Sequence, residues 1–203
     1  SIWWVGQWSD LIGRIDPKTG EMREYALPSK SKPHTVTVDK AGGIWYTGNG
    51  NGTIGKVDPA TGKVTVYKMP DPAAKDPHSA KFDPKGILWF TLQNSNMVGR
   101  LDPATGDIKL VTLKTPDSKP YGIKLDADGA PWFSCNGRPC RYKINPATME
   151  LTEVKLPYPG TTVRRQRLQG FGERMARRHD EHQVGTGDGR GEVAGGLQGF
   201  GQR

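Results

Sequence analysis

The sequence is poor in the residues that build metal centres and nucleophilic triads. It has two cysteines and four histidines, and neither set shows the spacing of a zinc site. No Ser-His-Asp set is evident, and the loop Gly48–Gly52 (GNGNG) lacks the lysine and the following helix of a phosphate-binding loop. No apolar run reaches membrane length, and no signal peptide is visible. These absences argue against a structural zinc site, a phosphate-loop enzyme and a helical membrane protein.

The two cysteines stand close together. Cys135 and Cys140 flank the tetrapeptide NGRP, between two predicted strands. Facing strands of a hairpin would bring the two sulfur atoms within disulfide reach, but two free thiols fit the sequence equally well. Two neighbouring cysteines do not assign a compartment, so periplasmic or secreted and cytoplasmic locations both stay open.

Lysine, proline, tryptophan and tyrosine are missing from the last part of the chain. Residues 161–203 contain eight arginines and ten glycines but none of those four types, although the whole chain carries a net charge of +8. As a real segment, residues 160–203 would be a disordered basic tail of the kind that binds nucleic acid. We favour a frameshift, because Met175-Ala176 read one base later gives the tryptophan codon. His179 and His182 are therefore discounted as site residues.

The rest of the chain is built from a repeated unit, clearest at His34–Pro70. HTVTV alternates polar and apolar residues, IWYT is rich in β-branched and aromatic residues, and TIGKV and VTVYKM follow. Turn sequences separate these four predicted strands. In DPATG, Pro59 presets φ, and Gly62 can take the positive φ that closes a hairpin. One unit therefore predicts four antiparallel strands.

The unit recurs with a period of about 43 residues, which is typical of a β-propeller. Trp45, Trp89 and Trp132 are 44 and 43 residues apart, and the turn reads DPKTG, DPATG, DPATG and NPATM in succession. A single blade cannot bury both faces of its sheet, so neighbouring blades must stack. We expect the tryptophans and alternating aliphatic residues to fill the space between blades. The predicted fold class is all-β, a propeller with four-stranded blades, of which about four are present.

The repeats define the expected boundaries. Residues 1–32 form a partial blade, and residues 33–76, 77–119 and 120–159 form three full blades. Ile2-Trp3-Trp4 aligns with Ile44-Trp45-Tyr46, so the sequence is expected to begin inside the second strand of a blade. A closed propeller needs more blades than these, which predicts a fragment.

Candidate site residues lie where the first strand of each blade begins. The first two strands are antiparallel, so this point neighbours the end of the second strand, at the mouth of the channel. Pro33-His34, Pro77-His78 and Pro120-Tyr121 occupy equivalent places there. A histidine can act as a general base near neutral pH, and Asp76 could orient His78 or help to hold a metal. Alternatively, the histidines hydrogen-bond to loop backbone and serve only the blade.

Other acidic residues repeat for a structural reason. Asp39, Asp83 and Asp126 each follow the first strand of a blade, in DKAGG, DPKGI and DADGA. Aspartate favours such turns because its side chain hydrogen-bonds to the backbone two residues on. We therefore interpret the three as turn formers and not as catalytic carboxylates.

The combination of PH-x-x-x-x-D, IWFT-like strands, IGR-hydrophobic and DPATG resembles the virginiamycin B lyase family, also called the streptogramin B lyases, over about residues 1–159. The resemblance implies a seven-bladed propeller. It also implies a bacterial antibiotic-resistance enzyme, a carbon–oxygen lyase that linearises cyclic depsipeptides by elimination with Mg²⁺. By the same resemblance His78 is the base, Asp76 a metal carboxylate and His34 a substrate-binding residue. Tyr121, at the equivalent place in the next blade, is a second candidate substrate-binding residue. Leu92 stands where the second metal carboxylate would be, so the implied Mg²⁺ lacks one ligand.

Two other functions fit the sequence. A non-catalytic propeller of the same family would recognise a small molecule or peptide at the channel mouth. A lactonase-like metal hydrolase would need several acidic or amide side chains converging on the channel, and we cannot place them. We expect a small-molecule or cyclic peptide ligand, not nucleic acid or a membrane, and a monomer when the propeller is complete.

Overall fold

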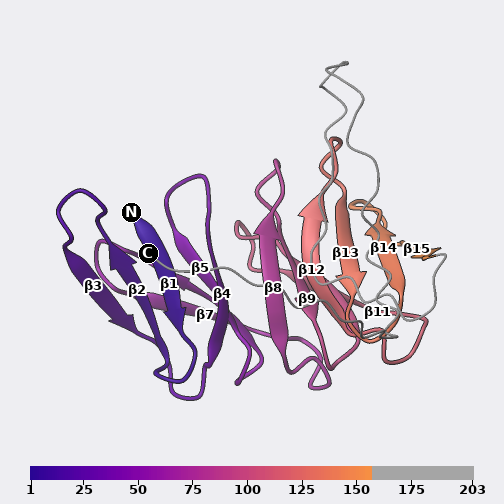
Figure 1. The fold of residues 1–203 in the computed structure, drawn as a ribbon, viewed down its shortest axis with the longest axis horizontal. Helices are drawn as coiled ribbons and strands as arrows, with labels where there is room; N and C mark the ends of the chain where they lie inside the picture. Colours follow the sequence, from indigo (N-terminus) through magenta and orange to yellow (C-terminus); the bar gives the residue numbers. More distant parts are fainter. Residues whose placement is uncertain (157–203) are drawn as a thin grey trace, which may run out of the picture. The chain divides into compact units, whose positions relative to one another are not determined.

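The structure is a computed structural model that describes residues 1–156. The chain divides into two units, Ser1–Phe171 and Gly172–Arg203, and the described residues belong to the first. The predicted tail at residues 160–203, with His179 and His182, lies outside the described residues. Within these residues all regular structure is β-strand, arranged in four sheets (Figure 1).

Each sheet falls within one sequence repeat. The first contains β1 (Ile2–Gly6), β2 (Leu11–Ile15) and β3 (Met22–Ala26). The second contains β4 (Pro33–Val38), β5 (Ile44–Gly48), β6 (Thr53–Val57) and β7 (Val64–Lys68). The third contains β8 (Pro77–Phe82), β9 (Leu88–Leu92), β10 (Met97–Leu101) and β11 (Ile108–Thr112). The fourth contains β12 (Pro120–Leu125), β13 (Pro131–Cys135), β14 (Cys140–Ile144) and β15 (Leu151–Lys155).

Strands that follow one another in sequence are antiparallel neighbours in every sheet. The first strands β4, β8 and β12 also lie beside one another, with β8 in contact with both of the others (Figure 1). The described part of the first sheet has three strands, and β1 pairs with β2 as β5 pairs with β6. Ile2 therefore sits where Ile44 sits in the next blade, as the sequence predicted. This arrangement confirms the all-β propeller with stacked blades.

The glycine in the IGK and VGR motifs has a packing reason. Gly55 lies opposite Tyr46 and Gly99 lies opposite Phe90 in the strand register. A Cβ atom on either glycine would run into the ring of that aromatic residue. Glycine is therefore required for the aromatic ring to lie flat across the neighbouring strand. In the DPATG turns, Gly62 and Gly106 take φ of 76° and 78°, as the turn sequence predicted.

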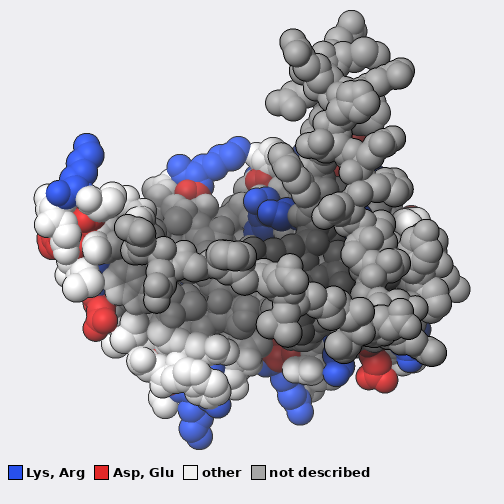
Figure 2. All heavy atoms as spheres, viewed as in Figure 1, with Lys and Arg blue, Asp and Glu red and all other residues white. Residues whose placement is uncertain are grey.

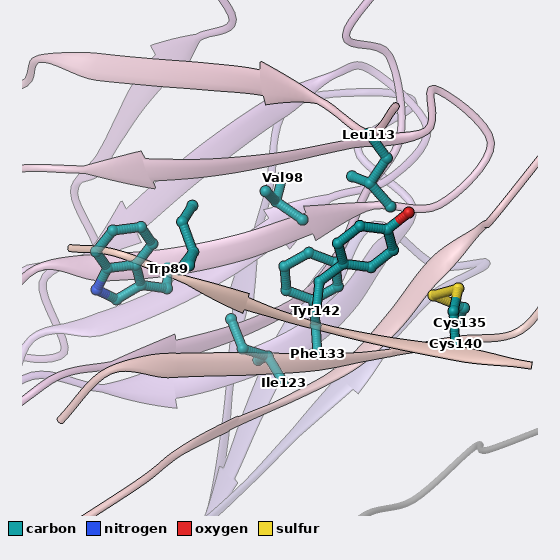
Figure 3. Packing of buried hydrophobic residues seen from close by; sticks show 9 residues of the cluster. Trp89, Val98, Leu113, Ile123, Phe133, Cys135, Cys140 and Tyr142 are labelled. Carbon is teal, nitrogen blue, oxygen red and sulfur yellow. A yellow bond between two sulfur atoms is a disulfide. The ribbon is translucent and has the colours of Figure 1, made fainter. Parts of the chain in front are cut away.

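Aromatic and aliphatic side chains fill the space between blades. Trp45 is fully buried, stacks on Tyr67 of its own blade and meets Phe82 of the next blade edge-on. Trp89 is buried in a cluster with Phe133 of the fourth sheet (Figure 3). Trp45 and Trp89 thus pack against the blade that follows them, and burial of an aromatic side chain contributes about 1.5–3 kcal/mol. The predicted inter-blade packing is confirmed for Trp45 and Trp89.

Most charged side chains lie at the surface, and Asp76 and Asp83 are buried. On the face drawn in Figure 2, lysines and arginines stand apart from one another, most of them toward the margins, with acidic side chains near several of them. Among the described residues, no helix has the length and apolar character needed to span a membrane.

Candidate functional site at the start of the inner strands

A β-bulge marks the same point in three blades. The register of the first strand against the second shifts between Pro33 and Val36, and equivalent shifts occur in β8 and β12. A bulge places an extra residue on one strand, bends that strand and re-aims its side chains. The residue that enters each bulge after the proline is His34, His78 or Tyr121.

The bulges bring these three rings into contact. The ring centroids of His34 and His78 are 3.5 Å apart with 33° between their planes. The centroids of His78 and Tyr121 are 4.5 Å apart with 42° between their planes. We call His34, His78 and Tyr121 the aromatic row. The structure therefore gathers three of the four predicted site residues, from three different blades, into one continuous surface.

Burial favours the neutral form of both histidines. His78 is buried, and this burial together with the neighbouring His34 lowers the pKa of His78 to about 4, against a weaker opposing effect of Asp76. Burial also lowers the pKa of His34, while a hydrogen bond to the backbone of His78 opposes that change. Two imidazolium ions at this separation would repel each other, so the close contact of the two rings belongs to the neutral forms.

Asp76, the fourth predicted site residue, holds a loop. Its carboxylate accepts hydrogen bonds from the Asn94 N–H at 2.5 Å, the Ser95 N–H at 3.0 Å and the Ser95 hydroxyl at 2.5 Å. The residue is 8% exposed. Three of the roughly four lone-pair positions of a carboxylate are thereby occupied by the β9–β10 loop. Asp76 thus fixes the connection beside His78, and little of its capacity remains for a metal.

The described residues do not fit the Mg²⁺ site that the family resemblance implies. Leu92 pairs with Pro77 in the register, is fully buried and belongs to an apolar cluster. The equivalent places in the other blades hold Gly48 and Cys135, of which Cys135 is in a disulfide. Mg²⁺ requires several oxygen ligands in octahedral geometry. No group of three or more His, Cys, Asp or Glu residues in the described part of the chain could hold a metal ion.

A hollow of about 490 Å³ lies beside the aromatic row. Asn49, Lys75, Asp76, Asn94 and Ser95 are among the residues that line it. Asn49 also donates a hydrogen bond from Nδ2 to the carbonyl of Pro77, the residue before His78. The volume is in the usual range of small-molecule sites, and amide and ammonium groups supply hydrogen bonds to an incoming ligand.

A second hollow, of about 510 Å³, lies at the other ends of the first strands, β4, β8 and β12. Val38, Phe82 and Leu125 give it an apolar lining, and Asp39 and Asp83 border it. Both carboxylates are engaged, because each accepts a hydrogen bond from a tryptophan indole and from two backbone N–H groups of its own turn. The prediction that these aspartates are turn formers is confirmed. We therefore place the candidate site at the aromatic row.

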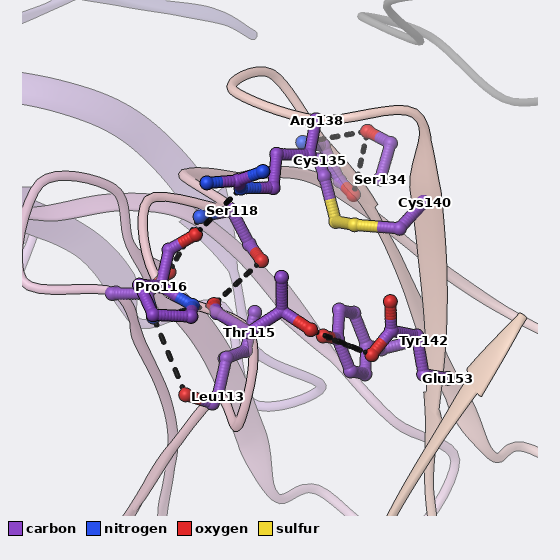
Figure 4. Close-up of a disulfide and its surroundings, with 12 residues drawn as sticks. Leu113, Thr115, Pro116, Ser118, Ser134, Cys135, Arg138, Cys140, Tyr142 and Glu153 are labelled. Atoms are coloured by element: carbon purple, nitrogen blue, oxygen red, sulfur yellow. Dashed lines mark hydrogen bonds between the residues drawn. A yellow bond between two sulfur atoms is a disulfide. The ribbon is translucent and has the colours of Figure 1, made fainter. Parts of the chain in front are cut away.

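Cys135 and Cys140 form a disulfide, which resolves the choice that the sequence left open (Figure 4). Their Cα atoms are 5.5 Å apart, at the end of β13 and the start of β14. Cys135 pairs with Pro120 in the register, so the disulfide closes the hairpin next to Tyr121. It fixes the strand ends of the fourth blade next to Tyr121, which is one end of the aromatic row.

Sequence reasoning missed two buried threonines that lie directly behind the row. The hydroxyl groups of Thr47 and Thr91 each accept a hydrogen bond from a bulge N–H of their own blade and donate one to a row residue of the next blade. A hydroxyl residue at the second-to-last place of each second strand, in IWYTG, LWFTL and PWFSC, is the signal that would have found them.

Known proteins of one family match this chain. A family model described as the virginiamycin B lyase family matches residues 1–87. The structure of selenomethionine-substituted virginiamycin B lyase from Staphylococcus aureus is similar with a TM-score of 0.72 and 30% identity, over 79% of this chain and 53% of that chain. A catalytically inactive variant of the same enzyme with quinupristin gives a TM-score of 0.71 and 33% identity, over 77% of this chain and 52% of that chain.

A streptogramin B lyase structure is also similar, with a TM-score of 0.70 and 31% identity, over 76% of this chain and 51% of that chain. None of the curated proteins matches. The chain spans about half the length of the solved relatives. The sequence motifs, the sheets and these similarities agree, and the chain belongs to the virginiamycin B lyase family of β-propellers.

Proposed function

We propose that this chain binds a cyclic depsipeptide of the streptogramin B type, or a related peptide-like small molecule, at the aromatic row. The contact of His34, His78 and Tyr121 across three blades carries the proposal. A solved relative, a catalytically inactive virginiamycin B lyase, is paired with quinupristin in its structure. Quinupristin is therefore the first ligand to test.

The chemistry of the face suits such a ligand. Neutral rings of histidine and tyrosine offer flat surfaces for apolar or aromatic groups, and their nitrogen and oxygen atoms exchange hydrogen bonds with amides. The hollow beside the row adds the side-chain amides of Asn49 and Asn94 and the ammonium group of Lys75. A peptide-like ring presents both kinds of group, apolar side chains and backbone amides.

Elimination is the second candidate function, with His78 as the base. In this reaction the base takes a proton from the carbon next to the one that bears the ester oxygen. The freed electron pair forms a carbon–carbon double bond, the C–O bond breaks, and the acid leaves as a carboxylate without consuming water. The neutral state of His78 at pH 7 favours this role, because only an unprotonated imidazole accepts a proton.

Two observations make binding the better-supported function. A base is most effective when its pKa is near the working pH, and a pKa of about 4 makes His78 a weak one. The described residues also supply no second carboxylate at Leu92 for the metal that would stabilise the developing negative charge. No step of the elimination is therefore assigned to a metal in the described blades.

Calorimetric titration of the full chain with quinupristin tests the binding proposal. We expect saturable binding that weakens at least about tenfold in His78→Ala and in Tyr121→Ala, a loss of about 1.4 kcal/mol. Lys109→Ala, on the exposed outer strand β11, is the matched control and should bind as the parent does. Absence of binding by a folded parent chain would overturn the proposal.

Liquid chromatography with tandem mass spectrometry of the recovered ligand separates the functions, because cyclic and linear isomers of equal mass differ in retention and fragmentation. Intact cyclic quinupristin after incubation indicates binding alone. A linear product with unchanged mass indicates elimination, because ring opening then neither gains nor loses atoms. A product heavier by one water indicates the lactonase-like hydrolysis. Loss of a linear product in His78→Ala would assign the proton transfer to that residue.

A further inference from the structure

We propose that Thr47 and Thr91 are positioning residues that set the spacing of the aromatic row across the blade boundaries. The proposal deepens the binding function above, since it concerns the same row, but its main test does not require a ligand. Both side chains are fully buried and neither contacts the hollow beside the row. Their action is therefore through the backbone of the row residues.

The bulge creates the need for these hydroxyl groups. Where the register shifts in β4, the ladder with β5 is interrupted, and the Thr35 N–H has no partner in the ladder. Thr47 Oγ1 accepts a hydrogen bond from that N–H at 3.0 Å. A buried N–H without a partner costs about 1–3 kcal/mol, so the hydroxyl is what makes the bulge beside His34 tolerable.

The same hydroxyl reaches the next blade. Thr47 Oγ1 donates a hydrogen bond to the carbonyl oxygen of His78 at 2.9 Å. One oxygen atom thus links the backbone that follows His34 to the backbone that carries His78. A hydroxyl can accept and donate at once, whereas an apolar side chain of the same shape can do neither.

Thr91 repeats the arrangement one blade further along. Its Oγ1 accepts from the Ser79 N–H at 3.2 Å and donates to the carbonyl oxygen of Tyr121 at 2.9 Å. Two hydroxyls in series therefore connect His34, His78 and Tyr121. Rigid support of this kind is what holds a binding surface to within a few tenths of an ångström.

The inference predicts that a blade-linking hydroxyl can be read out through the titration of His78. The groups that face His78 are His34 from β4, Tyr121 from β12 and Asp76 from the preceding loop. In Thr47→Val the link to His34 is lost, and the β4 and β8 bulges separate. Both causes that keep His78 neutral, burial and the nearby His34, then weaken.

The experiment is an NMR titration of the histidine side chains in the full chain. We expect the midpoint of His78 to rise by about one pH unit in Thr47→Val, and Thr47→Ser, which keeps the hydroxyl, to restore it. Thr91→Val should displace Tyr121 and change the ring-current shifts of His78, with a smaller effect on its midpoint. Thr53→Val is the control, because this buried hydroxyl bonds only locally, to Asn51.

Each outcome decides the matter. An unchanged His78 midpoint in folded Thr47→Val would overturn the inference, as would a shift of equal size in Thr53→Val. If Thr47→Val and Thr91→Val unfold while Thr53→Val folds, the inference is also overturned, because the two hydroxyls then serve stability and not spacing. Quinupristin binding is measured separately. Absence of quinupristin binding by the parent chain contradicts the proposed ligand. The His78 titration still tests whether the two threonines set the spacing of the aromatic row.

Discussion

The indole Nε1 of Trp89 donates a hydrogen bond to the Asp83 carboxylate at 2.9 Å, and both residues are buried. The other carboxylate oxygen of Asp83 accepts from the backbone N–H groups of Lys85 and Ile87, at 2.8 and 3.0 Å. One carboxylate therefore shapes the turn after the inner strand and fixes the tryptophan that packs against the next blade. Trp45 with Asp39 and Trp132 with Asp126 show the same relationship at 2.8 and 2.9 Å.

We expect Asp83→Ala to lower the free energy of unfolding by about 3 kcal/mol, because it leaves three hydrogen-bond donors without their acceptor. Urea unfolding measures the change. Asp102→Ala is the control, since Asp102 accepts from the Ala104 N–H in an exposed hairpin turn, and its loss should cost less than about 1 kcal/mol. Equal costs for the two variants would contradict the buried role of Asp83.

The recurrence of this relationship shows which parts of the structure can be predicted from the sequence. The repeat at Trp45, Trp89 and Trp132 predicts the sheets and their stacking because strand alternation and turn chemistry are local properties. The positive φ of Gly62 follows from the turn sequence for the same reason. The placement of His34 and His78 on one face follows from the repeat together with antiparallel pairing.

Contacts between blades could not be predicted in the same way. The hydroxyl of Thr47 matters because of a bulge and a carbonyl in another repeat, and neither is visible in the local pattern. From the sequence, Asp76 is a candidate metal ligand beside His78. In the structure its carboxylate instead accepts hydrogen bonds from Asn94 and Ser95 of the next loop. Whether Cys135 and Cys140 pair depends on their geometry, which the spacing alone leaves open.

The histidine pair predicts that the protein loses stability in mild acid. The pKa of His78 is about 4 in the folded chain against an ordinary 6.5, so the unfolded chain binds a proton more readily between these values. The lowered pKa of His34 acts in the same direction. Stability should be level above pH 6.5 and fall by about 1–3 kcal/mol as the pH drops toward 4.5.

Urea midpoints at pH 7 and pH 5 measure this effect. His78→Asn removes the titrating group and should make the two midpoints more alike. The aspartates with lowered pKa values, such as Asp39 and Asp126, lose their contribution only below their ordinary pKa near 3.8, outside this window. A parent chain that is more stable at pH 5 than at pH 7 would contradict the prediction.

The disulfide should stabilise the fourth blade through the loop that it closes. Cys135 and Cys140 are five residues apart, and the chain-entropy model gives about 2 kcal/mol for a loop of that length. Reduction, or the double substitution Cys135→Ser with Cys140→Ser, should therefore lower Tm by about 4–8 °C in a chain of this size. Calorimetry with and without dithiothreitol measures it, and the serine variant should not respond to the reductant. An unchanged Tm in both would contradict the prediction.

Mg²⁺ should not bind through Asp76. The carboxylate is 8% exposed and accepts three hydrogen bonds from the loop at Asn94 and Ser95, while the facing Leu92 is fully buried in an apolar cluster. A ligand that binds only the folded state raises Tm by mass action. We expect millimolar Mg²⁺ either to leave Tm unchanged or to raise it equally in the parent chain and in Asp76→Asn.

Asp76→Asn should itself lower the free energy of unfolding by about 1–3 kcal/mol, because an amide N–H in place of one oxygen faces the donors of the loop. Asp71→Asn, at a partly exposed turn where the carboxylate accepts from the Ala73 N–H, should cost less than 1 kcal/mol and serves as the control. A saturable, Mg²⁺-dependent stabilisation that is present in the parent chain and in Asp71→Asn but lost in Asp76→Asn would show that the loop yields its carboxylate to the metal, and it would restore the elimination chemistry to these blades.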